Sequence, residues 1–313
     1  KTEDIFYKTK SQYTRSLLDA IPSGRKPGKE FVATGTPLVE TSNLSIIFNG
    51  GSGSRESDVK AVDDISLQIY PGEVLGLVGE SGSGKSTLGR SILRLIPPQK
   101  GKVIFEGNDL TNLNHSELIR FRRKMQMIFQ DPYASLNPRM TIYQTLAEPM
   151  LHHGMATQED VLEKVLQLMD EVGLEQKNIL KYPHEFSGGQ RQRIAIGRAI
   201  SIKPDFIVAD EPVSALDVTI QSQILGLIMN LVERHGITML FISHDLSVVR
   251  SVTDRVAVMK SGRVIEDGKT EHLWQIPQDA YTRELLKSIP IADPRSERRR
   301  LLMNQNKKKG SDF

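Results

Sequence analysis

Cysteine is absent from the 313 residues of this sequence, and so is any long apolar segment. The lack of cysteine excludes disulfide bonds, thiolate zinc sites, cysteine-ligated iron–sulfur clusters and cysteine nucleophiles. No run reaches the roughly 18 consecutive apolar residues that a membrane-spanning helix requires. What remains is an ordinary mixture of 38% hydrophobic and 25% charged residues, which is typical of a folded globular chain.

Excess charge of one sign is scarce in the body of the chain. Residues 1–37 carry a net charge of +3 and residues 291–313 carry +4, whereas the residues between them carry −4. Much of the C-terminal excess comes from Arg298–Arg300 and Lys307–Lys309. We expect this basic tail, 291–313, to be solvated and poorly ordered. Because the acidic body argues against a nucleic-acid groove, we predict that nucleic acid is not a partner.

Two segments of the chain repeat each other at an offset of 268 positions. Residues 1–22 and 269–290 share ten identities in 22 positions, including Tyr-Thr-Arg, Leu-Leu and Ile-Pro. We interpret 1–22 as the C-terminal tail of a preceding homologous domain, and the Gly-, Pro-, Ser- and Thr-rich residues 23–37 as a linker. An unrelated amphipathic helix is the alternative, but helical periodicity does not explain the shared Tyr-Thr-Arg.

A glycine-rich loop follows the apolar run Val74–Val78, which predicts a buried parallel strand. The loop fits the Walker A pattern G-x-x-x-x-G-K-[ST]. It consists of Gly79, Glu80, Ser81, Gly82, Ser83, Gly84, Lys85, Ser86 and Thr87. Glycines let successive N–H groups converge on a phosphate, and the expected helix after them adds a partial positive charge. We predict that Lys85 binds the β- and γ-phosphates and that the Ser86 hydroxyl ligates magnesium. A chance glycine-rich turn is the alternative.

Two acids follow a second apolar run, Phe206–Ala209. A strand end in an open α/β sheet opens onto the ligand crevice, so Asp210 suits a Walker B role at magnesium. Glu211, one residue later, points in a different direction and suits a general base for the attacking water. Capping of the next helix is the alternative role for such a pair.

Two further polar residues follow strand-like runs. His244 lies just after the run Thr238–Ile242, which makes it a candidate for contact with the γ-phosphate. Gln130 follows Met125–Phe129, and an amide at such a strand end can ligate magnesium or hold the attacking water.

The tetrapeptide Ser187-Gly188-Gly189-Gln190 forms a second anion-binding helix start, because a helical run follows the two glycines. A simple glycine-rich N-cap is the alternative. One domain needs a single phosphate cradle, so a second one suggests a second half-site.

Residues 38–270 resemble an ATP-binding-cassette (ABC) nucleotide-binding domain. The resemblance rests on Ser187–Gln190 together with Gln130, Ser214–Asp217 and His244, which occur in the order that is typical of this family. The resemblance implies an α/β fold: a P-loop NTPase (RecA-like) core with an antiparallel β subdomain and an inserted α-helical subdomain. It implies an ABC ATPase domain over 38–268, followed by a C-terminal extension.

The helical subdomain is expected at about 131–190, with helices over 141–151 and 157–172. The resemblance further implies that ATP and Mg²⁺ are the ligands. Gln130 and His244 would assist Glu211 in hydrolysis, and the implied magnesium ligands are Ser86, Gln130 and Asp210.

The resemblance also implies a head-to-tail pair of ATPase halves. Each ATP would lie between the Walker A loop of one half and the Ser187–Gln190 segment and Asp217 of the other. The partner half would be either a second copy or a fused first half. Phe48 lies where the family places an aromatic side chain that stacks on adenine, although the insertion Gly50–Asp58 blurs the register.

Tyr182–Ser187 resembles the importer branch of this family, and 269–290 resembles the C-terminal extension of dipeptide, oligopeptide and nickel importers. These resemblances imply an ATPase that powers import of peptides, glutathione-like ones included. Membrane permease subunits would be direct partners and a solute-binding protein an indirect one, at the cytoplasmic face of the cell membrane. A soluble ABC ATPase acting on DNA or ribosomes is the alternative, while a phosphate-loop kinase leaves Ser187–Gln190 unexplained.

Overall fold

The computed structural model describes residues 2–19, 31–48, 59–289 and 293–300. Two sequence features lie largely or wholly outside these ranges. They are the insertion Gly50–Asp58, which lies wholly outside, and residues 301–313 of the basic tail. Most of the expected linker 23–37 also lies outside the described residues.

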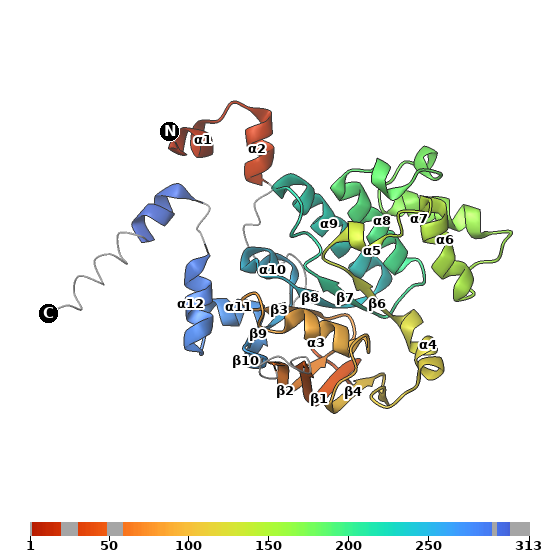
Figure 1. Ribbon diagram of the computed structural model, residues 1–313. Coiled ribbons are helices and arrows are strands. Elements are labelled where there is room, and N and C mark those ends of the chain that lie inside the picture. Colours follow the sequence, from red (N-terminus) through yellow and green to blue (C-terminus); the bar gives the residue numbers. More distant parts are fainter. Residues whose placement is uncertain (1, 20–30, 49–58, 290–292, 301–313) are drawn as a thin grey trace, which may run out of the picture.

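A six-stranded sheet forms the centre of the molecule, in the order β10-β9-β3-β8-β7-β6 (Figure 1). The strands are β3 (Val74–Val78), β6 (Met125–Ile128), β7 (Phe206–Asp210), β8 (Thr238–Ile242), β9 (Arg255–Lys260) and β10 (Arg263–Lys269). Neighbouring strands are parallel except β9 and β10. Every residue of β3, β7 and β8 is buried, because both faces of the sheet are covered. The carboxyl ends of these three strands therefore meet at one edge.

A second, antiparallel sheet packs over helix α3 (Lys85–Ile92), with the order β2-β1-β4-β5. Its strands are β1 (Val39–Phe48), β2 (Val59–Ile69), β4 (Lys100–Phe105) and β5 (Asn108–Asp109). Leu88 and Ile92 of α3 are fully buried in one core that includes residues of both sheets. The expected antiparallel subdomain is therefore present, and α3 is held between two sheets.

The opposite face of the central sheet is covered by α8 (Gly188–Ile200), α9 (Val218–His235) and α10 (Leu246–Val252), which share a second core. Helix α4 (His115–Lys124) precedes β6 and begins with a capping box between Asn114 and Glu117.

The segment between β6 and α8 is helical, as expected. It contains α5 (Pro132–Ser135), α6 (Ile142–His152), α7 (Val161–Glu171) and the 3₁₀ turns Gln176–Asn178 and Pro183–Glu185. The prediction that the second long helix begins at Thr157 is wrong. The Asp160 carboxylate accepts the N–H of Thr157 at 2.7 Å, and this local turn delays the start of α7 to Val161.

The repeated segments each form a pair of helices, near the two ends of the chain (Figure 1). Helices α1 (Thr2–Lys8) and α2 (Gln12–Asp19) correspond in register to α11 (Thr270–Gln275) and α12 (Ala280–Ser288). Tyr281 of α12 is 6% exposed, whereas its counterpart Tyr13 in α2 is 71% exposed. Among the described residues, no helix is long and apolar enough to cross a membrane.

Candidate functional site

The phosphate loop joins β3 to α3 and is pressed against its neighbours at two glycines. Gly79 has φ 151°, and a Cβ there would lie 2.1 Å from the carbonyl oxygen of Met259. Gly84 has φ 103°, and a Cβ there would lie 1.9 Å from the carbonyl oxygen of Ala61. A side chain at either position would strain the loop backbone and would also collide with the carbonyl oxygen of the neighbouring segment, so the loop geometry requires glycine.

The N-terminus of α3 opens into a cavity of about 470 Å³, a size suited to a small-molecule ligand. No side chain caps α3 at Gly84, so the first N–H groups of the helix stay available to an anion. The cavity is lined by Ala61, Ser81, Gly82, Gly84, Lys85, Ser86, Thr87, Gln130, Glu211 and His244. Residues predicted from four separate segments of the sequence are therefore assembled around one space.

Lys85 is 5% exposed and lies beneath the loop. Its Nζ donates to the carbonyl oxygens of Gly79 and Glu80, both at 2.8 Å. Burial lowers the pKa of Lys85, and the nearby carboxylates of Glu211, Asp210 and Glu80 oppose that shift. The ammonium is held by backbone carbonyls with limited hydration, so a phosphate oxygen that reaches it would be strongly attracted.

Asp210 ends β7 with a carboxylate that is completely buried. Its Oδ1 accepts a hydrogen bond from Ser86 Oγ at 2.7 Å, while its Oδ2 has no hydrogen-bond partner among the described residues. Arg90 approaches Oδ2 only to 3.7 Å, and burial raises the pKa of Asp210. A buried carboxylate oxygen without a partner, beside a hydroxyl, fits a hard divalent cation such as Mg²⁺.

Glu211 lies between two of the other predicted catalytic residues. Its Oε2 accepts a hydrogen bond from Gln130 Nε2 at 3.1 Å, and its Oε1 lies 3.1 Å from His244 Nδ1. The Glu211 backbone has φ 47°, a left-handed conformation that is unfavourable for a residue with a side chain. Its N–H donates to Ile242 at 2.9 Å, so pairing with β8 holds this conformation and aims the carboxylate at the cavity.

Ser187–Gln190 and Asp217 are not brought to this cavity. Ser187 caps α8 through a capping box with Gln190, and Asp217 caps α9 by accepting the N–H of Ile220. Gly189 packs so closely on α9 that a Cβ there would lie 2.5 Å from the Ile220 Cγ2. The N-cap interpretation therefore holds locally, while Ser187, Gly188 and Gln190 stay exposed at a helix start away from their own phosphate loop.

Phe48 is also outside the lining of the cavity. It ends β1 opposite Val59 and is 47% exposed, two positions of β2 away from the lining residue Ala61. Arg90 is a site residue that the sequence analysis missed. It lies four positions after Ser86, and this helical spacing could have placed it beside the same carboxylate.

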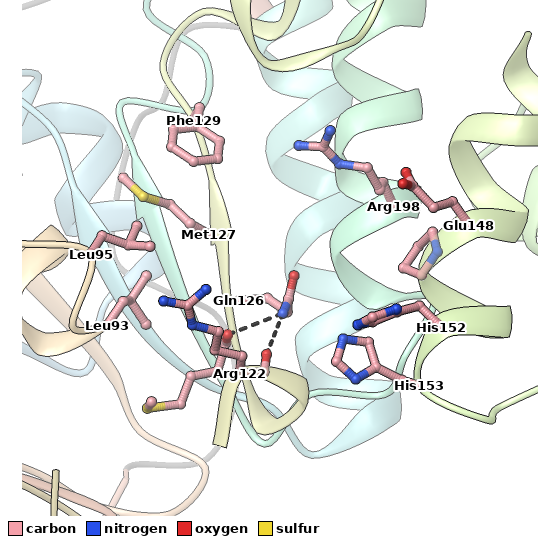
Figure 2. Close-up of a pocket in the computed structure, with 12 residues that line it drawn as sticks. Leu93, Leu95, Arg122, Gln126, Met127, Phe129, Glu148, His152, His153 and Arg198 are labelled. Atoms are coloured by element: carbon pink, nitrogen blue, oxygen red, sulfur yellow. Dashed lines mark hydrogen bonds between the residues drawn. The ribbon is translucent and has the colours of Figure 1, made fainter. Parts of the chain in front are cut away.

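A second pocket lies beside β6 and α6, which we call the lateral pocket (Figure 2). Leu93, Leu95, Met127 and Phe129 lie on one side of it, and Glu148, His152, His153 and Arg198 lie on the other. Arg198 donates to the carbonyl of Ser135 at 2.7 Å, which ties α8 to the loop after Gln130. Burial lowers the pKa of Arg198, opposed by Glu148. Phe129, which lines this pocket, directly precedes Gln130, which lines the cavity at the phosphate loop.

Two family patterns match the chain. The one described as ABC transporter covers residues 62–214, and the one described as oligopeptide/dipeptide transporter, C-terminal region, covers residues 265–310. A putative peptide import ATP-binding protein of Brucella ovis is 51% identical over 267 residues, which cover 85% of this chain and 83% of the relative. The glutathione import ATP-binding protein GsiA of Shigella dysenteriae is 42% identical, over 97% of this chain and 53% of GsiA.

Among solved structures, a similar one is the dimeric post-hydrolysis state of the ATP-binding cassette MJ0796 bound to ADP and Pi. It superimposes with a TM-score of 0.67 at 31% sequence identity, and the match covers 74% of this chain and 98% of that one.

Proposed function

Because the chain belongs to the ABC transporter family of ATP-binding proteins, we propose that it hydrolyses ATP to drive peptide import through a membrane permease. The observation that supports hydrolysis most directly is the position of the Glu211 carboxylate, which lines the phosphate cavity and is in contact with Gln130 and His244. The match of residues 265–310 to the C-terminal region of oligopeptide and dipeptide transporters supports peptides as the cargo, as do the names of the relatives.

Each cavity residue has a separate task in this proposal. The loop N–H groups and Lys85 bind the phosphates, and Glu211 accepts the proton of the attacking water. His244 and Gln130 orient the Glu211 carboxylate, and His244 would contact the γ-phosphate. Mg²⁺ bound with ATP would neutralise phosphate charge, and Ser86, Gln130 and Asp210 would hold it.

We further propose a head-to-tail pair of ATPase halves. At the start of α8, the backbone N–H groups of Ser187 and Gln190 bond within the capping box, whereas those of Gly188 and Gly189 are not used by the chain's own cavity. A partner's ATP could be completed by this helix start, with Asp217 nearby on α9. The dimeric form of MJ0796 supports this arrangement.

The lateral pocket is our candidate for the permease contact (Figure 2). It combines an apolar side with a polar side that carries both an acid and a base, Glu148 and Arg198, which suits an amphipathic segment of a partner. Phe129 lines it immediately before Gln130, so a bound segment could shift the residue that holds Glu211. Binding there would place the chain at the cytoplasmic face of the cell membrane, with a solute-binding protein as an indirect partner.

We propose the domain division given above: a tail of a preceding ATPase domain (1–22), a linker (23–37), the ABC domain (38–268), the extension (269–290) and the basic tail (291–313). The matched registers of α1 with α11 and α2 with α12 support the first part. The match to GsiA, which takes in 97% of this chain but 53% of GsiA, also supports it.

The proposed function is tested by deletion and complementation. Cells that lack the gene for this chain should lose energy-dependent uptake of labelled dipeptides and oligopeptides. The wild-type gene should restore uptake, whereas Lys85→Met should not, since it removes the cation of the phosphate site. Full peptide uptake by the deletion strain, or by the Lys85→Met strain, would contradict the proposal.

A further inference from the structure

The start of helix α12 is fastened to the central sheet by polar groups. Glu266 of β10 accepts the backbone N–H groups of Gln278 at 2.8 Å and Asp279 at 3.1 Å. The Asp279 carboxylate in turn caps α12 by accepting the N–H of Tyr281 at 2.7 Å. These contacts fix the first turn of α12, and so the position of the Tyr281 side chain.

Tyr281 reaches the phosphate loop from this helix. Its ring is 6% exposed and lies under the Lys260 ammonium, which is 4.4 Å from the ring centroid. Its hydroxyl oxygen accepts the backbone N–H of Glu80, the second residue of the loop, at 3.1 Å. Burial raises the pKa of Tyr281, so the hydroxyl stays protonated at neutral pH.

The same peptide unit connects Tyr281 to Lys85. The N–H of Glu80 and the carbonyl of Gly79 belong to one planar amide, and that carbonyl accepts from Lys85 Nζ at 2.8 Å. The tyrosine hydroxyl and the lysine ammonium therefore hold opposite ends of one rigid group, and hydrogen bonds in series strengthen each other. Gly79 has no side chain to restrict this unit, so the two hydrogen bonds act together with the close packing of Gly79 on Met259 to set its orientation.

This orientation determines where the Lys85 ammonium points. The group has three N–H donors, and the carbonyls of Gly79 and Glu80 occupy two of them in directions set by the backbone. The third donor faces only the Ser83 hydroxyl oxygen, at 3.5 Å, a long and weak contact that a phosphate oxygen would replace. If the Gly79–Glu80 amide rotated, the lysine would lose this direction and the loop would have to be reordered when ATP binds.

We propose that Tyr281 is a positioning residue of the ATP site, whose hydroxyl pre-orders the phosphate loop and Lys85 through the Gly79–Glu80 amide. The C-terminal extension is then a working part of the nucleotide site, although it lies about 200 positions away from the loop in the sequence. This inference rests on the proposed function, because it takes ATP as the occupant of the cavity.

The test compares Tyr281→Phe with Thr282→Val in the full chain. Phenylalanine keeps the ring under Lys260 and removes only the hydroxyl. Thr282 is the matched control: it is 1% exposed in the same helical turn, and its Oγ1 has no hydrogen-bond partner among the described residues. The readouts are the KM for ATP, kcat, and the melting temperature without nucleotide.

Tyr281→Phe should raise the KM for ATP about three- to tenfold, the worth of one neutral hydrogen bond, while kcat changes less than about twofold. The melting temperature of Tyr281→Phe should stay close to wild type. Thr282→Val should leave KM and kcat unchanged and the melting temperature unchanged or higher, because it removes a buried hydroxyl that has no hydrogen-bond partner among the described residues. An unchanged KM in Tyr281→Phe would overturn the inference. An equal rise in KM with Thr282→Val would also overturn it. So would a Tyr281→Phe chain in which only kcat or only the melting temperature is lowered.

Failure of the proposed function gives a different result. In that case the wild-type chain itself would show no saturable ATP hydrolysis, whatever residue stands at position 281.

Discussion

Replacing Glu211 with glutamine removes the base of the proposed hydrolysis and leaves almost everything around it in place. In the wild-type chain the Glu211 carboxylate lies 3.1 Å from both Gln130 Nε2 and His244 Nδ1. The carboxamide of the variant can still accept a hydrogen bond from Gln130 and can donate one to His244 Nδ1. The bonds of Ser214 go to the backbone carbonyl of residue 211, so they do not depend on the side chain. The substitution should therefore change the chemistry more than the structure.

The expected loss of kcat follows from the role of Glu211 as a positioned base. A positioned general base contributes about 10²–10⁴-fold to the rate, which corresponds to roughly 3–5 kcal/mol of activation free energy. The phosphate-binding groups, Lys85 and the loop N–H groups, are unaltered. We therefore expect kcat to fall by about 10²–10⁴-fold, with the dissociation constant for ATP changed less than about threefold.

The assay combines steady-state phosphate release with equilibrium binding of ATP. Glu106→Gln is a matched control, because Glu106 also has a left-handed backbone, with φ 48° against 47° for Glu211, and its carboxylate forms an ion pair with Lys124, which is 42% exposed. Such a surface pair contributes less than about 1 kcal/mol, so this variant should retain activity. A Glu211→Gln chain with wild-type kcat, or one that no longer binds ATP, would refute the assignment of Glu211 as the base.

Three further predictions concern the groups around Glu211. Asp210→Asn should raise the melting temperature of the nucleotide-free protein at pH 7. The raised pKa of Asp210 means that its buried charge destabilises the fold above the ordinary carboxyl pKa. Turnover should fall by about 10–100-fold, because the Asp210 carboxylate would help to hold Mg²⁺. A lower melting temperature would contradict this. Burial lowers the pKa of Lys85 below its ordinary value of 10.5, so Lys85 should begin to lose its charge, and the KM for ATP should begin to rise, at a pH below 10.5. A KM for ATP that stays constant up to pH 10.5 would count against a charged Lys85 at the phosphates. Gly84→Ala should lower the free energy of unfolding by at least about 2 kcal/mol and weaken ATP binding, because its Cβ would meet the Ala61 carbonyl at 1.9 Å. Gly226→Ala, in α9 with open space around it, should be neutral or stabilising, and equal losses in the two alanine variants would show that Gly84 is not special.

Much of the site could be predicted from local sequence. The apolar runs that become β3, β6, β7 and β8 are each followed within three residues by a polar residue that lines the cavity, since parallel strands deliver their carboxyl ends to one edge. Lys85 and Ser86 follow from the loop pattern, which needs no knowledge of the rest of the fold.

The remainder depends on packing between distant segments. Nothing in the sequence near Tyr281 indicates that its hydroxyl meets Glu80, because that contact depends on how β10 and α12 pack against the central sheet. The late start of α7 also escaped prediction, since the apolar stripe of that helix does not show that Asp160 forms a turn with Thr157. Similarly, the local sequence around Ser187 does not tell a simple N-cap from half of a shared ATP site.

The most direct test measures peptide accumulation and phosphate release together in membrane vesicles that contain this chain with its permease and solute-binding protein. With the wild-type chain, ATP supplied on the cytoplasmic side should drive accumulation of a labelled peptide, and both signals should rise together. With Glu211→Gln both should fall by about 10²–10⁴-fold while ATP still binds. Peptide accumulation that continues at the wild-type rate without ATP hydrolysis would contradict the account.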